Sequence, residues 1–264
     1  MLLEAKSKLD IELRAEKSLE KPLSAFKGDI HLLGKKSTSL SRSNVFFGRL
    51  YNWFALSGLA PSGWSVPTWL VYDDLEWWAS RVSVPGHLPL NKLNSANVLD
   101  LNNINSVPGF VSEIHIGNNV MGFNGLGTGV RLNGRHNINI AGYYHTTTQL
   151  NYIGIGYQQP TFSIFYSGGS YAAPQSGMAV RLVRSTTAGW KPGDILEDID
   201  GNVYDIIRVG DYLWTAQNWA STRLANGTEI THIPNNVAND AAWDTTTSAA
   251  YCNPSNSEWM VKRL

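Results

Sequence analysis

Apolar and polar residues alternate over short distances along most of the chain, and one segment has the spacing of a longer amphipathic helix. In residues 67–82, PTWLVYDDLEWWASRV, apolar side chains recur as on one face of a helix. Thr68 can cap the first turn, and the acidic residues Asp73, Asp74 and Glu76 favour the positive end of the helix dipole. We therefore predict a helix whose buried face carries Leu70, Leu75, Trp78 and Val82.

The remaining pattern predicts short strands joined by turns. The runs NVYDIIRVG (202–210) and DYLWTAQNW (211–219) flank a Gly-Asp turn, which is typical of a β-hairpin. The segment GMAVRLVR (177–184) predicts a short strand, whereas residues 122–134 and 138–149 are turn-rich with brief extended pieces. These patterns together predict a loop-rich α+β fold with short antiparallel strands and one or two helices.

Charge separates the first 43 residues from the rest. They contain nine Lys/Arg and six Asp/Glu, whereas the other 221 residues contain twelve and fifteen. We interpret residues 1–43 as an N-terminal arm or linker, and both a solvated arm and one that docks on a partner assembly fit this composition. Residues 44–186 then form the main body, and residues 187–264 form a third segment that contains the predicted hairpin.

The composition favours a globular protein. Hydrophobic residues make up 43% of the chain and charged residues 16%, with 24 glycines. The net charge of zero gives no general attraction to nucleic acids or anionic membranes. The N-terminus lacks the continuous apolar stretch of a signal peptide, and no apolar run reaches the roughly 18 residues of a membrane span. We therefore expect no nucleic-acid ligand, no membrane insertion and no standard secretory export.

Five tryptophans lie between residues 48 and 78, and indole rings are costly to expose in such number. We predict that Trp53, Trp64 and Trp78 belong to the core and that Trp69 and Trp77 are partly exposed.

The sequence offers little catalytic or metal-binding chemistry. The single cysteine, Cys252, has no histidine or second thiol beside it, and we interpret it as a semi-buried thiol. The six histidines show no HxH or HExxH spacing. The best candidate for a cation site is an acidic group that is better explained as turn residues facing water: Asp194, Glu197, Asp198 and Asp200. We predict no enzymatic activity, no metal site and no cofactor.

Several motifs together resemble one known family. GRLYNW, APSGWSVPT leading into a helix with DDLEWW, GFNGLGTGVRLNG, AGYYHTTTQ and GMAVRLVR occur in that order. They resemble the Fibrobacter succinogenes major paralogous domain, a module of secreted bacterial and phage-associated proteins. The resemblance implies a C-type-lectin-like fold, related to formylglycine-generating enzymes and to the variable proteins of diversity-generating retroelements. The GW-x-[VL]-P segment and the closing VRLVR strand are its most specific pieces.

The C-terminal segment resembles the same family in a permuted position. GNVYDIIRVGDYLWTAQNWASTRLANGTEI and AAWDTTTSAAYC look like the family's opening hairpin and the segment after it, yet here they follow VRLVR. The resemblance thus covers roughly residues 46–260. Three explanations are open: a circular permutation within one domain, a segment that completes a neighbouring subunit, and two partial modules. We favour one composite domain, formed within the chain or between subunits.

Residues 137–176 have the composition of a binding surface. They are rich in Tyr, Asn, Gln, Ser and Gly and contain no Lys, Arg, Asp or Glu, as in antibody paratopes. In the retroelement-diversified relatives, the variable residues lie just before the closing strand, and this segment occupies that place. Packing under long loops is the alternative explanation for each tyrosine. The candidate ligand-binding residues are Tyr143, Tyr144, Asn151, Tyr152, Tyr157, Gln158, Tyr166 and Tyr171.

The resemblance and these residues imply a non-enzymatic recognition or structural module on a bacteriophage particle. We expect a homo-oligomer at the virion surface that binds host-surface glycan or protein and attaches to other virion proteins through the arm. An extracellular or cell-surface location is the alternative. The competing functions are a purely architectural virion or surface protein and an enzyme of the formylglycine-generating type.

Overall fold

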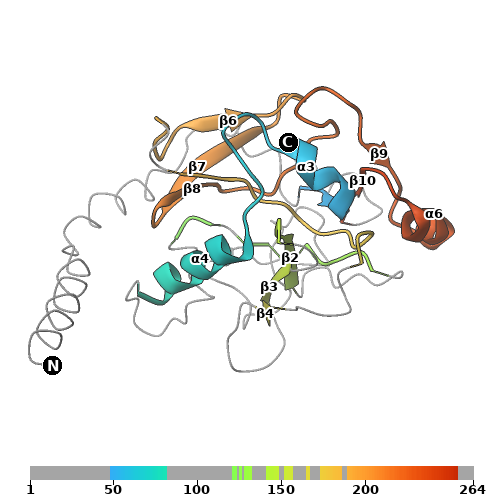
Figure 1. Cartoon of the computed structure of the whole chain (residues 1–264), viewed down its shortest axis with the longest axis horizontal. Helices are drawn as coiled ribbons and strands as arrows, with labels where there is room; N and C mark the ends of the chain where they lie inside the picture. Colours follow the sequence, from blue (N-terminus) through green and yellow to red (C-terminus); the bar gives the residue numbers. More distant parts are fainter. Residues whose placement is uncertain are drawn as a thin grey trace, which may run out of the picture. The chain divides into compact units, whose positions relative to one another are not determined.

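The computed structural model describes residues 48–81, 121–123, 125–126, 128–132, 141–148, 152–156, 165–166, 173–185 and 189–254. All of them belong to one compact unit of the chain, Ser39–Leu264 (Figure 1). The predicted N-terminal arm, residues 1–43, lies outside the described residues.

The described part has a mixed α+β fold built from short elements, which confirms the predicted class. Its helices are η1 (Trp53–Ala55), α3 (Leu56–Leu59), α4 (Trp69–Arg81), η4 (Val237–Asn239) and α6 (Asp240–Thr245). Its strands are β1 (Leu50–Tyr51), β2 (Ala141–His145), β3 (Tyr152–Gly156), β4 (Phe165–Tyr166), β5 (Val183–Ser185), β6 (Ile195–Glu197), β7 (Val203–Val209), β8 (Tyr212–Thr215), β9 (Thr231–His232) and β10 (Ala250–Cys252). No helix in the described part is long and apolar enough to cross a membrane.

The strands form three small sheets. The largest has the order β5-β8-β7-β6 with antiparallel neighbours, and it contains the predicted hairpin, β7 and β8, joined through Gly210 and Asp211. A second antiparallel sheet has the order β2-β3-β4. In the third, β10 pairs antiparallel with β1 and parallel with β9.

The C-terminal segment shares sheets and core with the body of the same chain. β8 pairs with β5, and β10 pairs with β1, so that Cys252 lies opposite Leu50. The backbone N–H of Arg49 also donates to the carbonyl of Trp219. Elements far apart in sequence therefore complete one another within this chain (Figure 1).

The buried side chains form two apolar clusters rich in tryptophan. Trp214 and Trp243 belong to the first, which also receives α4. Trp64, Tyr204 and Trp219 belong to the second, where the rings of Tyr204 and Trp219 stack with centroids 4.4 Å apart. Large aromatic faces thus fill a core that few regular elements surround.

The five N-terminal tryptophans fall close to the predicted positions. Trp64 is buried, and Trp77 is 40% exposed. Trp69 is half-buried, so the prediction is confirmed for these three residues. Trp53 and Trp78 are half-buried and pack against the edges of the two clusters rather than inside them.

Helix α4 confirms the predicted helix, and its buried face agrees with the prediction at Leu75 and in part at Trp78, which packs against the first cluster, but not at Leu70. Tyr72, Leu75 and Ala79 contact the first cluster, spaced as one helical stripe. Leu70, predicted on the buried face, is 57% exposed because it projects from the opposite side of that stripe. Val82 lies outside the described residues.

The predicted strand over residues 177–184 is wrong in its extent. Only β5 is a regular strand, and residues 177–179 make isolated bridges instead. Met178 pairs with Tyr51, Ala179 with Tyr144, and Gly177 with Arg131. The backbone is extended there, but its partners come from separate segments and form no continuous ladder.

Candidate functional site

Two of the predicted site residues meet on the hairpin of β2 and β3. Tyr143 lies opposite Gly154, and Tyr152 lies opposite His145. Their rings are 5.7 Å apart between centroids at an interplanar angle of 57°, and both side chains are half-buried. Gly154 has no side chain to cover Tyr143, so the diagonal neighbour Tyr152 reaches its ring.

Tyr144 was predicted to bind ligand, and the structure places it in the core instead. Its side chain is fully buried, and its ring lies 5.9 Å from that of Phe123 and 6.4 Å from that of Tyr72. Its hydroxyl accepts the backbone N–H of Leu126. Successive residues of a strand point to opposite faces, so only one of the adjacent Tyr143 and Tyr144 can face outward.

Of the other predicted site residues, the structure describes only the backbone of Tyr166. Tyr166 is in β4, where its backbone pairs with Ile153. Outside the described residues lie Asn151, Tyr157, Gln158 and Tyr171.

A buried histidine supports the outward face of the β2–β3 hairpin. His145 shares that face with Tyr143 and Tyr152 by register, and its Nε2 lies 2.7 Å from the carbonyl oxygen of Tyr51. The ring of Trp53 meets it edge-on at 6.5 Å. Burial lowers the pKa of His145 to about 4 against the raising effect of hydrogen bonds to Tyr51 and Ser176. We call Trp53, Tyr143 and Tyr152 the aromatic surface; none of its side chains carries a charge at neutral pH.

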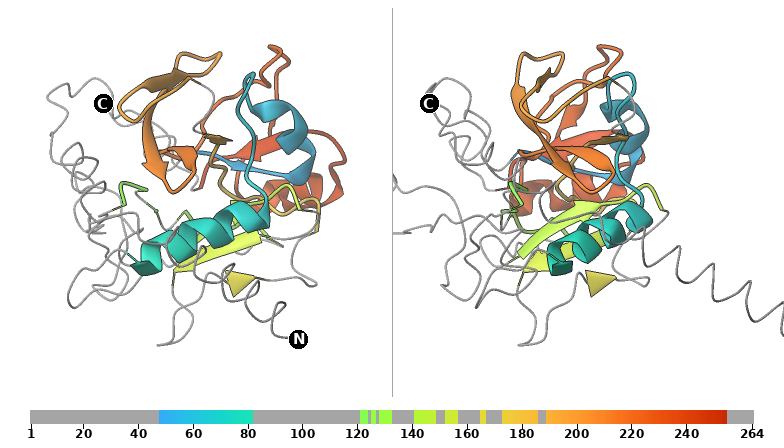
Figure 2. Two further views of the ribbon diagram at one scale, coloured as in Figure 1. Left: turned by 60° about the vertical axis from the view of Figure 1, so that its left-hand side comes forward. Right: turned by 90° about the vertical axis from the view of Figure 1, so that its left-hand side faces the viewer.

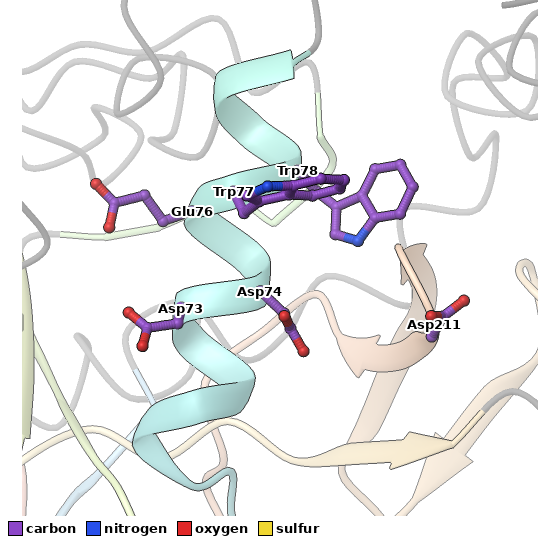
Figure 3. A pocket seen from close by; sticks show the side chains of 6 residues that line it. All are labelled: Asp73, Asp74, Glu76, Trp77, Trp78 and Asp211. Atoms are coloured by element: carbon purple, nitrogen blue, oxygen red, sulfur yellow. The ribbon is translucent and has the colours of Figure 1, made fainter. Parts of the chain in front are cut away.

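A second candidate site is a groove between α4 and the turn that joins β7 to β8 (Figure 3). It has a volume of about 670 Å³. The described residues that line it are Asp73, Asp74, Glu76, Trp77, Trp78 and Asp211. We call this the acidic groove.

The tryptophans of the acidic groove pack against each other and against the hairpin. Trp77 and Trp78 meet edge to face with ring centroids 4.9 Å apart. Gly210 has φ +60°, and a Cβ at this position would overlap the indole nitrogen of Trp78. Partial burial raises the pKa of Asp73, and the neighbouring charge of Asp74 raises it further.

Sequence reasoning missed the acidic groove. It interpreted Asp73, Asp74 and Glu76 as partners of the helix dipole, but the first turn of α4 contains no acidic residue. The available signal in the sequence was the predicted partial exposure of Trp77, which closely follows three carboxylates. The contribution of Asp211 has no local signal, because it depends on how the hairpin packs beside α4.

The acidic turn at residues 194–200 serves the fold. Asp198 is buried and accepts hydrogen bonds from the backbone N–H groups of Asp200 and Asn202 and from the hydroxyl of Tyr204. Asp200 pairs with Arg223. The prediction that these two carboxylates face water is therefore wrong. The described residues contain no group of three or more side chains suited to a metal ion.

The pKa of Asp200 reflects the same arrangement. Burial alone would raise it, but hydrogen bonds from Thr222, Arg223 and Ser221 lower it to about 2. The carboxylate is thus held ionised as a structural acceptor.

Cys252 is an inert thiol in this structure. Its side chain is fully buried, which confirms the interpretation of a packed thiol and extends it from semi-buried to buried. Burial raises its pKa to about 12, despite the lowering effect of Arg131 nearby. A thiol of that acidity is almost entirely protonated at neutral pH.

Comparison of the chain with protein-family models, curated proteins and solved structures found no match.

Proposed function

We propose that this chain is a non-enzymatic recognition module of C-type-lectin-like fold on a bacteriophage particle, which binds host-surface glycan or protein. The observation that carries the proposal is the pair Tyr143 and Tyr152. Two tyrosine rings stand half-exposed on the outer face of a hairpin, with ring centroids 5.7 Å apart. Rigid aromatic side chains of this kind provide contact area at little cost in conformational entropy.

The chemistry of the aromatic surface suits a sugar. The faces of aromatic rings pack on the apolar faces of pyranose rings, while phenolic hydroxyls can donate to or accept from sugar hydroxyls. The surface is also held in place by buried residues on both faces of the hairpin. His145 is hydrogen-bonded to Tyr51, and Ile153 on the inner face of β3 is fully buried in the core. A preformed surface loses less entropy when it binds.

The lectin-like fold is supported by the family motifs and by the mixed architecture in which α4 packs beside a small antiparallel sheet (Figure 2). The pairing of β10 with β1 favours one composite domain within the chain. We further propose that the N-terminal arm attaches the protein to other virion proteins as a homo-oligomer at the virion surface. The arm's surplus of basic residues motivates this assignment.

The second candidate function is purely architectural, with the aromatic surface covered by neighbouring subunits. An enzyme of the formylglycine-generating type has less support, because such chemistry needs reactive cysteines. The one cysteine, Cys252, is buried with its pKa raised to about 12.

Binding of the full chain to a glycan array and to host cells tests the proposal. The variants are Tyr143→Ala and Tyr152→Ala, singly and together, with Tyr212→Ala as the matched control because Tyr212 is a half-buried tyrosine outside the aromatic surface. We expect the double variant to bind at least about tenfold more weakly, since central aromatic contacts typically carry more than 1 kcal/mol each. Circular dichroism establishes that each variant folds.

Three outcomes decide between the candidate functions. Binding that is lost in the double variant and kept in Tyr212→Ala supports recognition. Binding that survives the double substitution removes the aromatic surface from the site. If the wild type binds neither glycan nor host cells, and the double variant no longer assembles into oligomers, the architectural function is favoured.

A further inference from the structure

The acidic groove offers a second binding site, separate from the aromatic surface. Helix α4 packs on the inner face of the β2–β3 hairpin, where Tyr72 meets Tyr144 and Ile153 belongs to the same cluster. Tyr143 and Tyr152 are on the outer face of the same hairpin. A ligand in the acidic groove therefore does not compete for the aromatic surface, and this inference does not depend on the proposed function.

The groove is formed by two elements that the core holds in place. α4 is anchored through Leu75 and Ala79, and the hairpin strand β8 contributes Trp214 to the same cluster. Figure 3 shows Asp74 and the two indoles on the side of α4 that faces the turn carrying Asp211, while Asp73 and Glu76 point to the other side. The groove thus has carboxylates on both walls and indole rings between them.

The charge of the groove is one-sided. Its described lining contains no Lys or Arg, and of its four carboxylates Asp74 and Asp211 lie between α4 and the turn, whereas Asp73 and Glu76 lie on the other side of the helix. Within the described part of the chain, Asp74 and Asp211 take part in no ion pair, since the two pairs found there join Arg131 to Asp240 and Arg223 to Asp200. The adjacent Arg208 directs its Nε to the carbonyl of Gly210 instead. An occupant with positive charge would complement this surface.

The exposed indole of Trp77 indicates which kind of cation the groove would bind. Trp77 is 40% exposed beside the carboxylates, an unusual position for so large an apolar ring. The face of an indole attracts cations, and arginine guanidinium both stacks on it and pairs with carboxylates through a planar fork of donors. Indole and carboxylate side by side therefore favour arginine over a simple inorganic cation.

The size of the groove argues in the same direction. A calcium ion needs six to eight oxygen ligands converging at about 2.3–2.6 Å. The groove instead spreads its carboxylates over two elements around about 670 Å³, which leaves room for more than one side chain. We infer that the acidic groove docks a basic, arginine-bearing peptide segment of a partner protein, with Asp74, Asp211 and Trp77 as its main contacts.

Fluorescence anisotropy with the full-length protein tests this inference. The probe is a fluorescein-labelled peptide in which three arginines alternate with glycines, and peptides with glutamine or glutamate in place of arginine serve as comparisons. We expect the arginine peptide to bind with Kd below about 1 mM, the glutamine peptide to bind at least roughly tenfold more weakly, and the glutamate peptide not to bind. Raising the salt concentration should weaken binding, because exposed charges are screened.

Variants locate the binding on the protein. Asp74→Asn combined with Asp211→Asn should weaken the arginine peptide roughly tenfold, and Trp77→Ala several-fold. Asp244→Asn, an exposed carboxylate on α6, is the matched control for charge. Leu70→Ala, an exposed apolar residue on α4 outside the groove, is the control for Trp77. Neither control should change the affinity.

Each alternative result overturns the inference. If the arginine and glutamine peptides bind equally well, charge does not drive the binding. If the Asp74/Asp211 double variant binds the arginine peptide with unchanged affinity, the peptide binds at another surface. Binding of spermine or Mg²⁺ in the groove without measurable binding of the arginine peptide would assign the site to small cations.

Discussion

The protonation of His145 gives a prediction with a magnitude that follows from the structure. Its imidazole is almost fully buried, and Nε2 donates to the carbonyl of Tyr51, which fixes the neutral tautomer. Burial lowers its pKa to about 4 in the folded protein, whereas the usual value is 6.5. At pH values between these two, the unfolded chain binds a proton at this residue and the folded protein does not.

The sign of the effect follows from proton linkage. Stability falls as the pH falls wherever the unfolded state binds more protons. Well above pH 6.5 the histidine has no effect, and the loss grows as the pH falls and levels off below the folded-state pKa of about 4. The difference corresponds to a loss of about 2 kcal/mol at pH 5 and about 3 kcal/mol at pH 4.

Urea unfolding followed by tryptophan fluorescence at pH 7, 5 and 4 measures this loss. In His145→Gln the amide can still donate toward Tyr51 but does not titrate, so the free energy of unfolding should fall less steeply by the amounts given above. His232→Gln is the control, because His232 lies exposed on β9. If His145→Gln loses stability as steeply as the wild type between pH 7 and pH 4, the histidine is not a buried neutral group and the reasoning fails.

Two further substitutions and one thiol reagent test how the core is packed. Gly210→Ala should lower the free energy of unfolding by about 1–3 kcal/mol in urea titrations, because φ is +60° and the new methyl group meets Trp78. Arg131→Met should cost about 3 kcal/mol or more by the same assay, since it leaves Asp240 without its buried partner; a loss below about 1 kcal/mol would contradict this. Cys252 should react with a thiol reagent such as Ellman's only after unfolding, and rapid reaction of the native protein would show that the thiol is accessible.

Local pattern predicted the elements whose stability is local. Helix α4 has its own amphipathic stripe, and the turn of the β7–β8 hairpin contains Gly210, whose positive φ few other residue types adopt. Alternation also implies that adjacent tyrosines face opposite ways, but it does not say which faces outward. Tyr144 is inside and Tyr143 outside because Phe123 and Tyr72, from distant segments, cover one face of the sheet.

Features built from distant segments were not predictable. The bridges of Met178 and Ala179 depend on Tyr51 and Tyr144, so the apolar run looked like a regular strand. Asp211 joins α4 in the acidic groove only because the hairpin packs beside the helix. The carboxylate of Asp200 looked like a solvated turn residue, since its donors Ser221, Thr222 and Arg223 lie beyond the β7–β8 hairpin.

Two buried arginines stabilise the irregular part of the core, and both lie in motifs that carry the family resemblance. Arg131 and Arg181 both occur in the tripeptide Val-Arg-Leu, within the motifs that carry the resemblance. Arg131 donates to the carbonyl of Ile233 and lies 4.4 Å from the ring centroid of Trp243.

Arg181 is arranged in the same way. It donates to the carbonyl of Thr215 and to the side chain of Asn218, and it lies 4.5 Å from the ring centroid of Phe123. Backbone carbonyls without a strand partner must find donors when they are buried. A guanidinium, with five N–H donors and a flat face, can supply them where no ladder does. We therefore expect a resemblance carried by motifs centred on such residues to concern architecture, and we propose that ligand specificity is set at the aromatic surface and the acidic groove instead.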